Sequence, residues 1–205
     1  VSAHGNGNIL LYAQGNESDL TIAADVVSQS GNITLKGAYN INLTDKSRIL
    51  TTAPGSISLK AESGSLTMEE DTSIELDIDG TLRLTTVDDM TLSLIDAGRI
   101  SMLAESGSIL TNAAETAHIS ASSLRLTAGQ AIGSADRPLS TSTAVLTAQA
   151  AGGAEAADEN AREAKTGIYI NETDDIEINT VSVRVLEFTA TGELQEVTDA
   201  SPQSD

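Results

Sequence analysis

Short runs of alternating apolar and polar residues follow one another along most of the chain. The alternation is clearest between positions 55 and 84, where a new run begins about every eight residues. Period-two alternation is typical of a strand that buries one face, because successive side chains point to opposite sides. Small and polar residues separate the runs, as expected of turns. The apolar positions of these predicted strands are Ile57, Leu59, Leu66, Met68, Ile74, Leu76, Ile78, Leu82 and Leu84.

A longer period indicates how these strands are arranged. A five-residue motif begins with glycine and places its first apolar residue at Ile9, Ile33, Ile57 and Leu82, which are 24, 24 and 25 positions apart. A repeat of this length is typical of units that cannot bury an apolar face alone and stack on their neighbours. We therefore predict an all-β fold, a right-handed parallel β-helix (β-solenoid) with about three short strands per turn and roughly 7–8 turns.

The composition agrees with a narrow aliphatic interior. The chain has 205 residues, of which 40% are hydrophobic, yet it contains only three Tyr, one Phe and no Trp. Globular cores usually depend on aromatic side chains for buried area. Branched aliphatic residues stacked in columns are a better explanation of this composition.

The repeat loosens after position 84, and this affects the predicted boundaries. The pentapeptide at 61–65 returns at 104–108, 43 positions later, which we interpret as five strands and not a whole number of 24-residue turns. We expect some turns to be shorter, nearer 20–22 residues by this spacing. The predicted organisation is a polar lead-in at 1–8, a shaft over 7–190 with an Ala/Glu-rich loop or short helix inserted at 150–166, and an acidic tail or linker at 191–205.

Charge and the absence of cysteine exclude several classes of function. The formal net charge is -19, so the chain is a poor match for nucleic acid, whose binding depends on Lys and Arg neutralising phosphates. Without cysteine, neither disulfides nor thiolate metal sites are possible. No apolar run approaches the roughly 18 residues that indicate a membrane span, so we expect no membrane insertion.

The chain resembles a known family over roughly residues 7–190, and several of the motifs that carry the resemblance lie in its later part. An Ile-Gly-small patch at 131–134, Pro-Leu at 138–139, a Leu-Thr-Ala strand at 146–148 and Gly-Ile-Tyr-Ile at 167–170 are similar to repeats of giant bacterial exoproteins related to filamentous haemagglutinin. The resemblance implies a β-helix shaft that is secreted to the bacterial cell surface. It also implies work in adhesion, with host or neighbouring-cell surface components, either glycans or proteins, as partners, together with neighbouring repeats of the same longer chain. The chain starts without a methionine, and we expect it to be a piece of a longer protein.

Two alternative functions stay open. The first is a calcium-dependent binding module, because acidic clusters at predicted turns supply the oxygen ligands that Ca²⁺ prefers. The simpler alternative is that these clusters are solvated corners of the fold. The acidic clusters are Glu69 to Asp71, Asp77 with Asp79, Asp88 with Asp89, and Asp174 with Asp175.

The second alternative is a carbohydrate-active enzyme, a polysaccharide lyase or hydrolase, since parallel β-helices can carry the carboxylate pairs that such chemistry uses. Two predicted outward columns share one face: Leu10, Thr34, Ser58 and Arg83, and Tyr12, Lys36, Lys60 and Thr85. This face has cations and no carboxylate, which argues against the enzyme. His4 and His118 have no catalytic or metal partner nearby in the sequence. We therefore predict a non-enzyme and assign no catalytic, cofactor-binding or metal residue, with calcium as the one possible cofactor.

Overall fold

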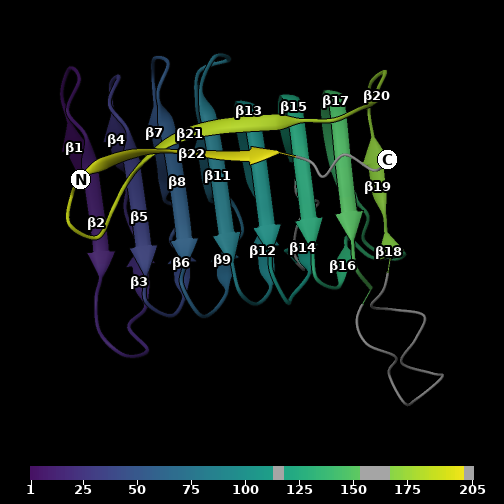
Figure 1. Ribbon diagram of the computed structural model, residues 1–205, viewed down its shortest axis with the longest axis horizontal. Coiled ribbons are helices and arrows are strands. Elements are labelled where there is room, and N and C mark those ends of the chain that lie inside the picture. Colours follow the sequence, from purple (N-terminus) through teal and green to yellow (C-terminus); the bar gives the residue numbers. More distant parts are fainter. Residues whose placement is uncertain (113–117, 153–166, 201–205) are drawn as a thin grey trace.

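Parallel strands stack along one axis and form a β-solenoid of about six turns, as Figure 1 shows. The computed structural model describes residues 1–112, 118–152 and 167–200, and within these ranges it contains strands and no helix. The strands form a 13-stranded sheet, a 7-stranded sheet and a separate two-stranded sheet. The solenoid prediction is confirmed, with fewer turns than the 7–8 we expected.

The solenoid has three faces, because each turn contributes a strand to each of three ladders. The front face contains β2 (Ile9–Ala13), β5 (Ile33–Gly37), β8 (Ser56–Ala61), β11 (Thr81–Thr86), the second halves of β13 (Leu94–Ala104), β15 (His118–Ala128) and β17 (Leu139–Ala150), and β20 (Glu177–Ile178). The second face contains β1 (Ser2–Ala3), β4 (Val26–Ser28), β7 (Arg48–Thr51), β10 (Ser73–Glu75), the first halves of β13, β15 and β17, and β19 (Ile170–Glu172). The third face contains β3 (Leu20–Ile22), β6 (Ile41–Leu43), β9 (Leu66–Met68), β12 (Met90–Leu92), β14 (Ile109–Thr111), β16 (Ala131–Ile132) and β18 (Gly167–Ile168).

Aliphatic side chains form continuous columns inside the solenoid. The column predicted from the repeat runs along the front face, where each member is the ladder partner of the next: Ile9, Ile33, Ile57, Leu82, Ile100, Leu124 and Leu146. All seven belong to a single core cluster, and the buried hydrophobic residues of the described chain are Ile, Leu, Val, Met and Ala. Identical or similar branched side chains at one ladder position fill a narrow interior without voids.

Turn length varies more than we expected, and this explains the pentapeptide repeat. Lys60, Thr85 and Leu103 are consecutive ladder partners, separated by 25 and 18 positions. The 43-residue spacing is therefore two whole turns, one long and one short, and our interpretation as five strands was wrong. The short turn arises because β12 is followed almost immediately by β13, and because β13 continues from the second face to the front face without a loop like that at 76–80.

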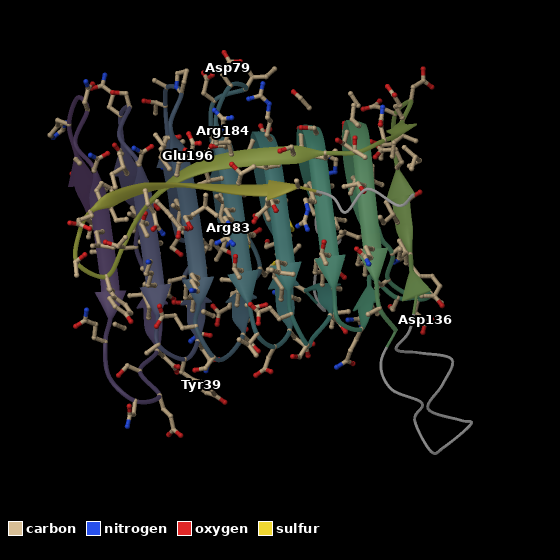
Figure 2. The ribbon with its side chains drawn as sticks, in the orientation of Figure 1. Tyr39, Asp79, Arg83, Asp136, Arg184 and Glu196 are labelled. Carbon is tan, nitrogen blue, oxygen red and sulfur yellow. The ribbon has the colours of Figure 1, made fainter. Side chains whose placement is uncertain are left out.

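Ile78 does not extend the strand that contains Ile74. The strand β10 ends at Glu75, and the chain then leaves the ladder in a loop closed by a hydrogen bond from the Gly80 amide to the Asp77 carbonyl, 2.7 Å. The Ile78 side chain is 76% exposed. The loop rises at one edge of the strand array, where Asp79 is labelled in Figure 2.

The two ends of the chain also differ from the expected boundaries. Part of the lead-in is ordered, since Ser2 and Ala3 pair with β4 as the first strand. The solenoid ladder ends at Ile178, short of position 190, and the expected tail is instead part of an antiparallel hairpin of β21 (Ser182–Phe188) and β22 (Leu194–Ala200). The insertion expected at 150–166 lies mostly outside the described residues, as does the end of the chain beyond position 200.

Candidate functional site

The outward side of the front face collects basic side chains. Five of the 11 Lys and Arg residues of this acidic chain lie in its outward columns: Lys36, Lys60, Arg83, Arg99 and Arg125. These columns contain no carboxylate from β2 through β17. The sequence predicted this charge pattern for the part of the face that includes Arg83 and the two lysines.

The hairpin of β21 and β22 lies over this basic face. Figure 1 shows the two strands running along the rod, across the solenoid strands beneath them. The hairpin alternates, so that Val183, Val185 and Glu187 face inward and are buried while Arg184 and Leu186 are exposed. Its tight turn contains Gly192 with a φ of 81°, a left-handed conformation that glycine adopts without strain.

Two carboxylates of the hairpin neutralise Arg83. The Nε of Arg83 donates to Oδ2 of Asp199 at 2.9 Å, and its Nη1 lies 3.5 Å from Oε2 of Glu187. The three side chains are only 13%, 15% and 6% exposed, respectively. Charges so far from water need partners, because an unpaired buried charge is strongly destabilising. The ion pairs therefore fix where the hairpin docks.

Hydroxyl groups of the front face complete the contact. Ser58 donates to Glu187 at 2.7 Å and Ser101 donates to Asp199 at 2.9 Å. The backbone amides of Leu186 and Phe188 donate to the hydroxyls of Ser56 and Thr34, at 3.1 and 2.9 Å. The edge of β21 thus finds acceptors among side chains of the solenoid, as a strand edge requires when it is covered.

Arg125 lies next to this network and is less well partnered. Its Nη1 donates to the Ser101 hydroxyl at 3.4 Å, while its buried Nε has no hydrogen-bond partner. Burial lowers the pKa of the Arg125 guanidinium, an effect that Asp199 opposes and Arg83 reinforces. The contact between hairpin and face is consequently charged and incompletely satisfied.

A second feature is a groove on the second face, at the corner where β13, β15 and β17 bend. It has a volume of about 470 Å³ and a floor of small residues, and its lining includes Leu76, Ile78, Asp96, Ser120, Asp174 and Asp175. The Ser142 hydroxyl donates to Asp174 at 2.6 Å. Polar and apolar groups thus meet in a channel that follows the rod axis.

The predicted acidic clusters are mostly engaged locally. Asp71 pairs with Lys46, and Asp77 accepts from the amide of Asp79 at 3.1 Å. Asp89 accepts from the amide of Ser108 at 2.8 Å. No group of three or more His, Cys, Asp or Glu side chains placed to hold a metal ion occurs in the parts of the chain that the structure describes.

The two histidines do not join any of these features. His118 is exposed at the start of β15 and pairs in the ladder with Leu94 and Ser140. His4 lies in the turn after β1, where its carbonyl oxygen accepts from the amide of Gly7 at 3.2 Å. Of the charged residues described above, sequence reasoning missed Arg99, Arg125, Glu187 and Asp199. The signal that could have found Glu187 is the Val-x-Val-x-Val-x-Glu alternation before Thr191 and Gly192.

No protein-family model, no curated protein and no solved structure matches this chain. Among the described residues there is also no helix long and apolar enough to cross a membrane.

Proposed function

We propose that this chain is a non-catalytic shaft segment of a large secreted protein of the bacterial cell surface. The observation that carries the proposal is the unbroken ladder of parallel strands around one aliphatic core. Each inner turn is hydrogen-bonded to the turns before and after it, so bending the rod requires stretching backbone hydrogen bonds. The spacing of about 4.8 Å per turn gives a rod about 30 Å long.

The hairpin supports a mechanical role. The strand β21 contacts the front face from β5 to β13, and its valines pack on Val145 of β17. One element therefore ties together turns that otherwise contact only their immediate neighbours, as is usual in solenoids. A strap of this kind opposes separation of the turns when the rod is pulled or bent.

In this proposal the rod holds a binding region at a distance from the cell. The partners are components of a host or neighbouring-cell surface, either glycans or proteins, and further repeats of the same longer chain continue the shaft. The resemblance of the repeats to bacterial exoproteins related to filamentous haemagglutinin supports this assignment. So does the acidic surface, since a large net charge of one sign keeps copies of a protein apart.

Surface display tests the proposal. The chain is placed between a bacterial surface anchor and a tip domain of known ligand, and adhesion to ligand-coated beads is measured through a polymer layer on the cell. The matched control is a flexible Gly/Ser linker of about 30 residues, because a random coil of that length has a root-mean-square span of about 30 Å, equal to the rod, but does not stay extended. The shaft proposal expects the rod to support adhesion where the coil fails, and equal adhesion would refute it.

The groove at the bend favours one competing function, a carbohydrate-active enzyme, because it places Asp96 and Asp174 along one channel. Incubation with anionic polysaccharides, followed by assays for unsaturated and reducing ends, tests this possibility. Turnover by the parent chain that is lost in Asp96→Asn and Asp174→Asn would support the enzyme and refute the shaft proposal. The calcium-binding alternative is tested by melting in calcium, where a bound ion raises the midpoint with concentration.

A further inference from the structure

The hairpin is docked as a separable element and not as part of the main core. Its buried residues Val181, Val183 and Val185 form a second, smaller cluster that contacts the solenoid through Val145. The rest of the contact is made by ion pairs and hydroxyl hydrogen bonds, and it leaves Arg125 Nε and Thr85 Oγ1 buried without partners. Contacts of this polar kind are typical of surfaces that associate and separate.

The hairpin is joined to the solenoid only at the carboxyl-terminal end of the rod. The last ladder strand, β20, ends at Ile178, and β21 begins at Ser182. From there β21 runs back along the rod, so that Phe188 reaches Thr34 near the other end (Figure 1). If the chain straightens at Asn179 and Thr180, between the last ladder strand and Val181, the hairpin projects beyond the end of the rod.

The same end of the rod exposes apolar side chains. Ile168 is 45% exposed and Ile178 is 73% exposed, and Ile176 lies between them in sequence and is also exposed. The strands β18, β19 and β20 have a ladder neighbour on one side only among the described residues. Unpaired strand edges with apolar side chains are sites where another chain can add.

We propose that the hairpin also docks in trans, on the front face of a second copy of this chain, in a two-fold dimer joined at the carboxyl-terminal ends of the rods. We infer a second copy as the occupant because its front face presents the same Arg83 that binds Glu187 and Asp199 within one chain. Exchange of an identical element re-forms every contact of the docked hairpin, so it costs little free energy.

The direction of the hairpin determines the symmetry. In its own chain β21 starts at the carboxyl-terminal end of the face and runs toward the amino-terminal end. A second copy presents its face in that direction only if its carboxyl-terminal end meets the first rod. Head-to-tail stacking would require the hairpin to bind in reverse, with Glu187 and Asp199 away from Arg83. The exchange therefore gives a closed dimer and not a filament.

Charge also predicts the conditions that favour exchange. Asp174, Asp175 and Glu177 are exposed and adjoin Ile176 and Ile178 in the sequence, and in the dimer they approach their equivalents. Salt screens this repulsion between exposed carboxylates, whereas the ion pairs of the docked hairpin are the same in monomer and dimer. The dimer is therefore favoured by raised salt. This inference goes beyond the shaft role and does not depend on it.

Mixing two single-cysteine variants of the full chain tests the proposal, because the chain has no cysteine of its own. One variant carries Val145→Cys on the face and the other Val183→Cys on the hairpin, because Val145 packs against the valine cluster that contains Val183 and neither residue takes part in the ion pairs. A short thiol-specific crosslinker then joins the two variants only where the hairpin of one lies on the other. The double variant V145C/V183C confirms that the positions crosslink within one chain.

The matched control replaces Val183→Cys with Ser182→Cys, the adjacent residue of the same strand, which is exposed. Exchange predicts several-fold more V145C–V183C heterodimer than V145C–S182C heterodimer, an excess that grows with salt, and a mass of two chains in light scattering. Circular dichroism verifies that all variants are folded. Equal yields from the two mixtures, or larger assemblies in place of a dimer, would overturn the proposal.

Discussion

Replacing Arg83 with glutamine should release the hairpin and leave the solenoid intact. The substitution removes the cation that faces Glu187 and Asp199, whose side chains are 6% and 15% exposed. Breaking a buried pair from one side costs about 3–5 kcal/mol when the remaining charge stays buried. Here the loss is smaller, about 2–4 kcal/mol, because an undocked hairpin returns both carboxylates to water.

Native-state hydrogen exchange measures this directly. A loss of that size raises the opening equilibrium of the hairpin by roughly 30- to 700-fold. We expect amides of β21 and β22 to exchange correspondingly faster in Arg83→Gln, while amides of β8 and β11 in the solenoid core keep their protection. Global melting should shift only slightly, since the hairpin adds a minor part of the buried apolar area.

Arg184→Gln is the matched control. Arg184 pairs with Glu196 at 3.4 Å on the outer side of the same hairpin, with side chains 70% and 50% exposed (Figure 2). Such pairs contribute well under about 1 kcal/mol. If Arg83→Gln and Arg184→Gln changed hairpin exchange equally, or if Arg83→Gln opened the solenoid strands as well, the ion network would not hold the hairpin in place.

Three further predictions follow from single positions. Leu66→Asp should unfold most of the rod, because Leu66 is 1% exposed in the core and an aspartate there has no partner. The control is Thr67→Asp, on the outward side of the same strand, and the unfolding free energies of the two variants in denaturant should differ by several kcal/mol. Similar midpoints would contradict the inward position of Leu66. Gly98→Ala should be markedly destabilising, since a Cβ there lies 1.9 Å from the Ile78 carbonyl oxygen. Gly55→Ala should destabilise the protein less, because its Cβ lies 3.0 Å from the Gly31 carbonyl oxygen. Equal shifts of the melting temperature in the two variants would refute the close approach at Gly98. Hydrogen bonds from Arg48 lower the pKa of Asp25. The stability from this carboxylate is therefore present above its unfolded pKa of about 3.9 and is lost as pH falls through the lower folded value. The melting temperature of Asp25→Asn should fall less steeply with acid than that of the parent, and an unchanged slope would count against this pair.

The interior of the solenoid could be predicted because it depends on local alternation and a constant repeat. Ile9, Ile33, Ile57 and Leu82 share a motif, and ladder pairing placed them one above another. Ile78 could not be assigned in this way. Its apolar side chain continues the alternation, but the Asp77–Gly80 turn removes the residue from the ladder.

The covered front face was only half predictable. The cations at Lys36, Lys60 and Arg83 follow from the column register, yet Asp199 lies 116 positions from Arg83 in the sequence. No repeat relates the hairpin to the turns that it covers, so nothing in the periodicity indicates where it docks. Its strand character was readable from the alternation, whereas an acidic composition suggested a tail.

Distances between spin labels on the third face test the stacked-turn account most directly. Thr21, Asn42, Thr67, Thr91 and Leu110 are consecutive ladder partners whose side chains alternate with the buried positions. With one label at Thr21, the distance to a second label at position 67, 91 or 110 should rise by about 4.8 Å per turn, to about 10, 14 and 19 Å. Dipolar spectroscopy resolves such steps. Distances that fail to rise in this order would contradict a single stack of turns, and with it the proposed shaft.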